Sequence, residues 1–291
     1  MRHVPSDTVG CAGPLREVAT SPPARDRRDT DAGTERAGEL RTMAENISGA
    51  RAHLMDLIRT TIPPIHPGGR PIVLGVAAGT IGARFVLRAV GLKGAGRAVG
   101  RAGAVATLAS TAFFRAPRRV PPVGQGLVVA PADGLVSLIQ DAAPPPELGL
   151  DPTPRPRVSI FLSIFDVHVQ RIPVDGVITR IAYRPGTFVS ADLDKASAEN
   201  ERNSLVIQAT LGGQLVVTQI AGLVARRIVC DAKPGSPVLA GDTYGLIRFG
   251  SRVDTYLPVG TEVAVRRGQR TIGGETVLGT ARTSRATLGD S

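Results

Sequence analysis

The sequence predicts a mainly β protein of the α+β class, in which short membrane-associated helices precede an antiparallel β-sandwich or barrel-like domain. Two observations carry this prediction. After Pro121, short β-prone runs alternate with turns rich in Gly, Pro and Asp, a pattern typical of an all-β domain. Before it, two apolar stretches are joined by a basic, Gly-rich link. We therefore expect a disordered extension over residues 1–45, a helical region over 46–120 and a β-rich region over 121–291.

The N-terminal extension is rich in Pro, Arg, Asp, Thr and Gly and has no apolar periodicity. Such a segment cannot bury enough apolar surface to offset the entropy lost on ordering, so we expect it to be disordered. It also lacks the basic and then apolar pattern of a secretory signal.

The two apolar stretches run over residues 71–87 and 104–114. The uninterrupted part of each is about 12 residues, or about 18 Å as a helix, whereas a bilayer core is about 30 Å thick. Arg84 lies inside the first stretch, and both flanks and the link are basic, so the positive-inside rule gives no alternation of sides. We expect a shallow or re-entrant helical hairpin on the cytoplasmic face of the cell membrane. The alternative is a pair of buried core helices.

The β-rich region contains nine runs that we predict as strands. Gly212 and Gly213 stand between two of them, which favours a tight hairpin. The predicted strands are 127–130, 135–139, 158–162, 177–183, 205–209, 215–220, 244–249, 262–265 and 276–278.

The composition points to an anionic partner. The formal net charge is +10, and nearly all of the positive charge is Arg. With no Trp and 3% aromatic residues, the chain lacks the rings that stack on the bases of single-stranded nucleic acid. An anionic membrane surface therefore suits it better than a nucleic acid. The two cysteines lie far apart and the four histidines have no zinc-like spacing, so we expect neither a disulfide framework nor a metal site.

Three residues form a candidate catalytic set, in the order Asp133, His168, Ser251. A carboxylate that orients an imidazole, and an imidazole that takes a proton from a hydroxyl, can activate serine as a nucleophile. Each residue alone has a plainer interpretation: Asp133 and Ser251 stand in turn-like sequences, and a lone His in an apolar run is usually a core residue. Ser251 is not in a Gly-x-Ser-x-Gly elbow, which disfavours an α/β-hydrolase.

Several segments, in order along the chain, resemble the phosphatidylserine decarboxylase family, and in particular its short prokaryotic branch found in actinobacteria. They are APADG, FLSIFDVHVQRIPVDG, the Asn-Glu-Arg sequence at 200–202, QIAGLVARRIVC and GDTYGLIRFGS. The resemblance covers about residues 50–280. One departure is the cleavage motif, which often reads Leu-Gly-Ser-Thr in the family, whereas Arg252 follows Gly250-Ser251 here.

This resemblance implies a proenzyme that cuts itself between Gly250 and Ser251 by serinolysis. Ser251 would become a covalent pyruvoyl cofactor, leaving a β chain (1–250) and an α chain (251–291) in one folded unit. The pyruvoyl group would form a Schiff base with phosphatidylserine and release CO2, giving phosphatidylethanolamine, with His168 as the acid that returns a proton. No metal or nucleic acid would be required, and a homo-oligomer stays open.

Two other functions remain open at this point. A lipoyl- or biotinyl-like carrier would use Lys195 in the Asp194-Lys195-Ala196 triplet, and a membrane-anchored serine hydrolase would use the same three catalytic residues. The site of a mass increment, or reaction with a fluorophosphonate probe, distinguishes them from a proenzyme.

Overall fold

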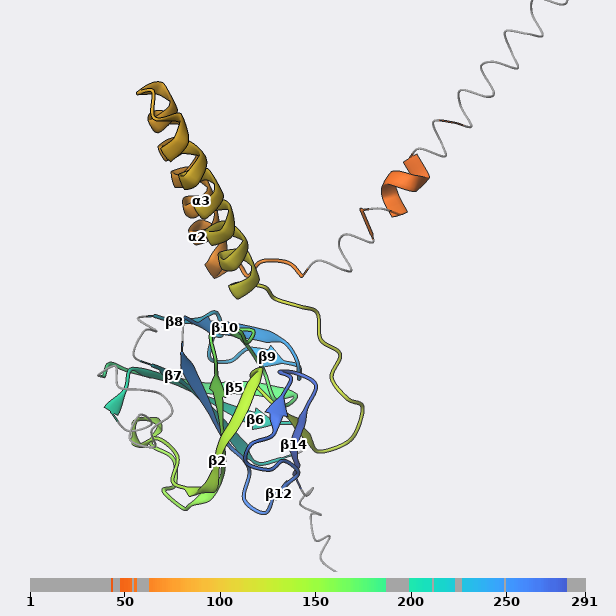
Figure 1. Ribbon diagram of the computed structural model, residues 1–291. Helices are drawn as coiled ribbons and strands as arrows, with labels where there is room; N and C mark the ends of the chain where they lie inside the picture. Colours follow the sequence, from red (N-terminus) through yellow and green to blue (C-terminus); the bar gives the residue numbers. More distant parts are fainter. Residues whose placement is uncertain are drawn as a thin grey trace, which may run out of the picture. The chain divides into compact units, whose positions relative to one another are not determined.

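The computed structural model describes residues 43, 48–53, 55–56, 63–186, 199–210, 212–222, 227–248 and 250–281. The chain forms two compact units, Met1–Ile58 and Arg59–Ser291, and all the labelled elements of Figure 1 belong to the second. Apart from Met43, the expected disordered extension over residues 1–45 lies outside the described residues, as does the Asp194-Lys195-Ala196 triplet.

Two long helices, α2 (Arg70–Ala89) and α3 (Lys93–Phe113), form an antiparallel pair. A short 3-10 turn, η1 (Pro67–Gly69), leads into α2. Gly91 has a φ of +85°, which allows the tight link between the helices. The helices approach closely at Gly103, where a Cβ atom would lie 2.0 Å from Cγ2 of Thr80. The expected helical hairpin is therefore confirmed.

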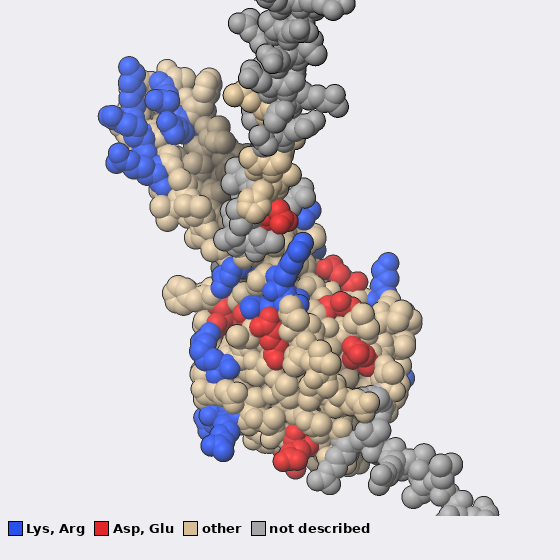
Figure 2. Space-filling view, turned by 90° about the vertical axis from the view of Figure 1, so that its right-hand side faces the viewer, with Lys and Arg blue, Asp and Glu red and all other residues tan. Residues whose placement is uncertain are grey.

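The helices are longer than the sequence analysis expected. α2 has 20 residues and α3 has 21, because both continue through arginines that were counted as interruptions. Arg84 and Arg88 in α2, and Lys93, Arg97 and Arg101 in α3, are exposed, and Figure 2 shows the basic side chains gathered at one end of the helical pair. A charged residue that reaches solvent does not interrupt a helix.

The two helices bury little of their surface. Val73 is the one residue of α2 that is buried, and Gly96 and Phe113 are those of α3. Five large apolar side chains are more than 60% exposed: Leu74, Ile81, Phe85, Val105 and Leu108. The alternative of two buried core helices is therefore wrong. The segment Pro67–Ala89 is long and apolar enough to cross a membrane by length and composition.

The β region contains one curled eight-stranded sheet and two three-stranded sheets, and all their strand pairs are antiparallel (Figure 1). In the order of pairing, the large sheet contains β13 (Arg270–Thr271), β2 (Gly134–Ala142), β3 (Arg155–Leu162), β11 (Ser251–Tyr256), β7 (Gln214–Ala221), β6 (Arg202–Ala209), β5 (Gly176–Arg184) and β9 (Pro237–Val238). The small sheets are β1 (Leu127–Val129), β14 (Val277–Thr280) and β12 (Glu262–Val263), and β4 (Val169–Arg171), β10 (Thr243–Ile247) and β8 (Ile228–Cys230). A second 3-10 turn, η2 (Pro146–Leu148), lies between β2 and β3. The mainly β class is confirmed.

The main core lies between these sheets and is built from their inward-facing aliphatic residues. It includes Val136, Ile160, Leu205, Val217 and Val253. All nine predicted strands overlap observed ones, and Gly212 and Gly213 have φ of +96° and +83° in the turn before β7, as the hairpin prediction requires.

A second apolar cluster joins the base of the helical pair to the strands. It contains Val73, Phe113, Phe114 and Leu246. Phe114 packs so closely on Gly69 that a Cβ atom there would lie 2.3 Å from the ring. This cluster places the end of α3 directly beside the strands that carry the candidate site.

Candidate active site

Ser251 is the first residue of β11, in the middle of the large sheet. It lies opposite Leu162 of β3 on one side and Ala221 of β7 on the other. The residue is fully buried, and its Oγ has no hydrogen-bond partner among the described residues. A buried hydroxyl without a partner loses free energy of about 1–3 kcal/mol, so this position calls for a chemical explanation.

Gly250 gives the chain its turn into β11. Its φ is +58°, in the left-handed region that favours glycine. A Cβ atom built on Gly250 meets nothing within 4 Å. Glycine is therefore favoured here for its backbone conformation, and not because a side chain would lack space.

His168 lies between the turn at residues 163–166 and strand β4. Its Nδ1 is 2.9 Å from the carbonyl oxygen of Asp166. A carbonyl oxygen only accepts, so Nδ1 carries a hydrogen and donates it. In the neutral ring the lone pair is then on Nε2, which is buried and has no partner among the described residues. This tautomer leaves Nε2 available as a base.

The surroundings of His168 favour its neutral form. Burial lowers the pKa of His168 from 6.5 to about 4, against the opposing effect of the hydrogen bond to Asp166. The nearby charge of Arg115 lowers the pKa further. One face of the ring is covered by Phe113, with ring centroids 4.1 Å apart.

A chain of buried amides fixes the backbone of His168. Gln170 Nε2 donates to the His168 carbonyl at 2.8 Å, and Gln219 Nε2 donates to Gln170 Oε1 at 3.1 Å. Asn203 Nδ2 then donates to Gln219 Oε1 at 3.1 Å. These residues connect β4 to β7 and β6. β7 also pairs with β11, the strand that begins at Ser251. The hydrogen bonds therefore connect the backbone of His168, through β7, to the strand that carries Ser251.

Asp133 lies under the linker that follows α3. Its Oδ2 accepts from Arg119 Nη2 at 2.8 Å, and its Oδ1 accepts from the backbone N–H of Gly273 at 2.7 Å. Burial raises the pKa of the Asp133 carboxyl, and the Gly273 and Arg119 contacts oppose that rise. In the described residues no hydrogen bond joins Asp133 to His168, whose Nδ1 is held by Asp166 instead. The sequence analysis expected the Asp133 carboxylate to orient the His168 ring. In the structure the backbone carbonyl of Asp166 contacts His168 Nδ1 instead.

Comparison with known proteins identifies the family. The phosphatidylserine decarboxylase family model matches residues 107–279. The chain belongs to this family. It is 54% identical to a phosphatidylserine decarboxylase proenzyme of Mycobacterium sp. (strain JLS), over 82% of this chain and 97% of that protein. It is 57% identical to one from Nocardia farcinica, over 78% of this chain and 92% of that protein.

The matched region contains Asp133, His168, Gly250 and Ser251, whereas α2 lies before it. The resemblance to an actinobacterial branch of the phosphatidylserine decarboxylase family is thus confirmed. The roles of the four site residues stay predictions.

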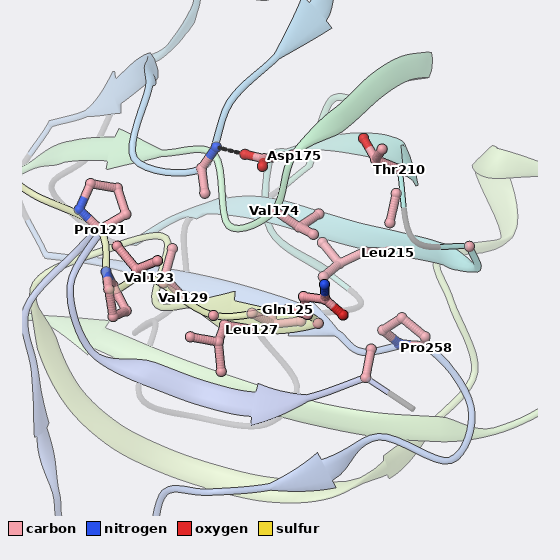
Figure 3. Close-up of a pocket in the computed structure, with 18 residues that line it drawn as sticks. Pro121, Val123, Gln125, Leu127, Val129, Val174, Asp175, Thr210, Leu215 and Pro258 are labelled. Atoms are coloured by element: carbon pink, nitrogen blue, oxygen red, sulfur yellow. Dashed lines mark hydrogen bonds between the residues drawn. The ribbon is translucent and has the colours of Figure 1, made fainter. Parts of the chain in front are cut away.

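One open cavity of the described structure lies away from these residues. It has a volume of about 420 Å³ and is lined by Val123, Leu127, Val174, Leu215 and Pro258, among others (Figure 3). At its rim the Asp175 carboxylate accepts from the backbone N–H of Ala240 at 2.7 Å. Leu215 is six residues along β7 from Ala221, about 20 Å away. None of the candidate catalytic residues lines this cavity. The candidate site is therefore identified by its buried side chains and not by a cavity.

Sequence reasoning missed three contributors to the site: Phe113, Asp166 and the pair Arg252–Asp254. Arg252 Nε donates to Asp254 Oδ1 at 2.6 Å and its Nη2 to Oδ2 at 3.0 Å, with both side chains buried. In the sequence, Val253 and Thr255 alternate with the charged Arg252 and Asp254, which is a weak indication of a strand. It is weak because charged residues in a sequence usually indicate a solvent-exposed segment.

Proposed function

We propose that this chain is a phosphatidylserine decarboxylase proenzyme that breaks its own backbone between Gly250 and Ser251. The observation that carries the proposal is that Ser251 Oγ and His168 Nε2 are both buried and have no hydrogen-bond partner, each other included, among the described residues. They occur in a family whose relatives are named phosphatidylserine decarboxylase proenzymes.

In the first step His168 Nε2 takes the proton of Ser251 Oγ, and the oxygen attacks the carbonyl carbon of Gly250. The Gly250–Ser251 C–N bond breaks as an ester C–O bond forms, and the Ser251 nitrogen leaves as an amine. This is the proton transfer and nucleophilic attack that a serine–histidine pair performs. Gly250 carries no side chain beside the carbonyl that is attacked, and its left-handed φ of +58° shapes the turn there.

Elimination then completes the break. The Cα proton of Ser251 is removed, the Cβ–O bond breaks, and the Gly250 carboxylate departs. The resulting dehydroalanine tautomerises to an imine, and water hydrolyses it to a ketone with release of ammonia. Residue 251 thus becomes a pyruvoyl group at the start of the α chain (251–291), and the β chain (1–250) ends in an ordinary carboxylate.

A pyruvoyl ketone supplies an electron sink for the loss of CO2 from an amine-linked substrate. The residues around position 251 have the properties that this chemistry needs. The site is buried between β3 and β7, which excludes bulk water. His168 Nε2, which is unprotonated at rest, would take a proton from the substrate ammonium group and return it to the carbon that loses CO2, so decarboxylation gives phosphatidylethanolamine.

Asp133 enters this proposal as a residue beside the site rather than as the direct partner of His168. Its carboxylate is engaged with Arg119 and Gly273. A direct contact with His168 requires the Arg119 pair to open. An Asp133→Asn variant that cleaves itself at the normal rate would remove Asp133 from the catalytic set.

The substrate remains in a membrane, and the helical pair suits such a location. Its apolar faces are exposed, and its far end carries five basic residues. Basic side chains near a bilayer are attracted to anionic headgroups. We therefore place the protein at the cytoplasmic face of the cell membrane, held by α2 and α3.

Mass analysis of the purified protein tests this proposal. The expected result is a fragment that begins at residue 251 with a blocked, pyruvoyl N-terminus. It is absent from a Ser251→Ala control that keeps one intact chain. His168→Ala is expected to abolish decarboxylation and to slow the self-cleavage. An unbroken wild-type chain that is active, a mass increment on Lys195, or a wild-type chain labelled intact by a fluorophosphonate would overturn the proposal.

A further inference from the structure

The turn at residues 163–166 presents two large apolar side chains to solvent, immediately before His168. Ile164 is 56% exposed and Phe165 is 80% exposed. The central positions of β-turns usually carry Gly, Pro, Asn, Asp or Ser. Two adjacent exposed apolar residues at these positions need a reason other than the turn itself.

The turn is held rigidly at its base. The backbone N–H of Asp166 donates to the Ser163 carbonyl at 3.0 Å, and Asp166 Oδ2 accepts from both the N–H and the Oγ of Ser163 at 2.8 Å. Asp166 itself is 6% exposed. The two apolar side chains therefore project from a fixed base.

Two arginines frame the turn. Arg115 Nη2 donates to the Phe165 carbonyl at 2.9 Å, and Arg270 pairs with the Asp166 carboxylate. Arg270 is 64% exposed, and its neighbours Arg266 and Arg267 are exposed as well. Figure 2 shows basic side chains on the strand region as well as at the tip of the helices. An exposed apolar pair beside two arginines matches a surface of acyl chains and anionic headgroups.

We propose that Ile164 and Phe165 form a second membrane contact, separate from the helical pair, which inserts into an anionic bilayer beside the active site. The chemistry recognised is a negatively charged lipid surface, through the apolar pair and the surrounding guanidinium groups. This inference rests on the proposed function for its purpose, because Asp166, whose backbone N–H closes the turn, also holds His168 Nδ1 through its carbonyl oxygen. The contact would bring the lipid headgroup to the residue that returns the proton.

The chain has no tryptophan, so a Phe165→Trp variant places a single fluorescent reporter in the turn. Val259→Trp is the matched control, because Val259 is 68% exposed and follows the end of β11 opposite to Ser251. On vesicles of phosphatidylcholine mixed with phosphatidylglycerol, the indole emission of the Phe165→Trp variant is expected to shift to the blue and to be quenched by brominated acyl chains. The indole emission of the Val259→Trp variant is expected to stay unchanged. An unquenched indole in vesicle-bound Phe165→Trp protein would overturn the proposal.

A second experiment measures the consequence for binding and turnover. The full chain carrying Ile164→Ser and Phe165→Ser is expected to partition onto the same vesicles about tenfold less than wild type, as the loss of buried apolar area requires. Its decarboxylation of phosphatidylserine in vesicles should fall about ten times more than its decarboxylation of a soluble short-chain phosphatidylserine, while Val259→Ser changes neither. Equal losses on both substrates would show a folding defect and would overturn the membrane role.

The remaining outcomes are also decisive. If the double substitution leaves vesicle partition unchanged and instead converts an oligomer to a monomer, the turn is a contact between copies of this chain and the proposal is wrong. If the indole of the Phe165→Trp variant enters the bilayer but the wild-type protein never decarboxylates phosphatidylserine, the proposed function fails while the membrane contact stands.

Discussion

The phenyl ring of Phe113 lies on the imidazole of His168, with ring centroids 4.1 Å apart and planes inclined by 34°. Phe113 is the last residue of α3, so the end of the helical pair forms one wall of the candidate site. With the Asp166 carbonyl on Nδ1, this wall fixes the plane of the His168 ring. The contact joins the part of the chain that we place at the membrane to the group that we expect to move protons.

The first prediction concerns this contact. Phe113→Leu should retain the fold, because the position stays apolar, but the smaller side chain should cost about 1–2 kcal/mol in stability. It should lower kcat for decarboxylation and raise the pKa seen in the pH profile, since a less covered imidazole is less costly to charge. Phe114→Leu is the control, because Phe114 is equally buried but packs on Gly69. Indistinguishable pH profiles for the two variants would leave Phe113 with a packing role alone.

The second prediction follows from the lowered pKa of His168. Self-cleavage needs the neutral imidazole, and the pKa of about 4 keeps it neutral across most of the acid range. The rate constant for cleavage should therefore be nearly flat from neutral pH down to about pH 5, and fall about tenfold per pH unit below about pH 4. Time courses of chain cleavage in newly refolded protein measure this. A midpoint near 6.5 would mean that the ring is solvated when it acts.

The same shift predicts an acid-dependent loss of stability. His168 has a pKa of about 4 when folded and 6.5 as the free side chain, so the unfolded state binds more protons between these values. Stability is then present above about pH 6.5 and is lost as the pH falls toward 4, by up to about 3 kcal/mol. Urea unfolding of Ser251→Ala at neutral and acid pH should show this loss. Adding His168→Gln should reduce it, and an unchanged pH dependence would contradict the assignment.

The fourth prediction tests whether Gly250 is needed for its backbone conformation or because a side chain would not fit there. Gly250→Ala should fold, because its Cβ meets nothing within 4 Å, but it should lose about 1–2 kcal/mol for the left-handed φ of +58°. Cleavage should slow by about tenfold, equivalent to about 1.4 kcal/mol in the barrier. Gly260→Ala has the same open surroundings and a φ of +79°, so it should cost similar stability without slowing cleavage. If both variants cleave at the wild-type rate, the conformation of Gly250 is not used in the reaction.

The fifth prediction concerns the buried pair that follows Ser251. Asp254→Asn leaves the Arg252 guanidinium without its carboxylate in the sheet, and should cost about 3–5 kcal/mol in the free energy of unfolding. Replacing both with Arg252→Met and Asp254→Leu should cost less than Asp254→Asn alone, because only Arg157, whose Nη1 lies 3.8 Å from Asp254 Oδ2, then loses its carboxylate, whereas Asp254→Asn leaves both arginines without it. Denaturant unfolding of these variants in the Ser251→Ala chain measures the difference. A larger loss in the double variant would show that the other contacts of the pair dominate.

The strands were predictable where one face is apolar and the turns contain Gly, as in β6 and β7. β11 was not, because Arg252 and Asp254 are buried on the face of the strand opposite to the core residue Val253 and pair with each other there. The sequence alone does not indicate that Arg252 and Asp254 form an ion pair inside a sheet. The helices were recognisable, but their lengths were not, since Arg84 and Arg88 lie at an exposed end.

Ser251 and His168 could be predicted as site residues from the sequence, because the chemistry expected of them depends on side chains and on motifs that resemble a family. Phe113 could not, because it reaches His168 across a separation of 55 residues that only the fold closes. Asp166 contacts His168 Nδ1 through its backbone carbonyl. Every residue has such a carbonyl, so the residue type does not indicate this contact. An acid at Asp133 was the natural expectation for that position, and the structure shows its carboxylate engaged with Arg119.

Strand β11 has a hydrogen-bonded neighbour on each side, β3 and β7. On the proposed cleavage, the chain that carries the reactive group is thus a central strand of its partner's sheet and cannot leave without unfolding it. Maturation happens once, and a spent or damaged group cannot be exchanged for a fresh one. Each molecule would then have a finite catalytic lifetime, and a cell could restore activity only by synthesising the whole protein again.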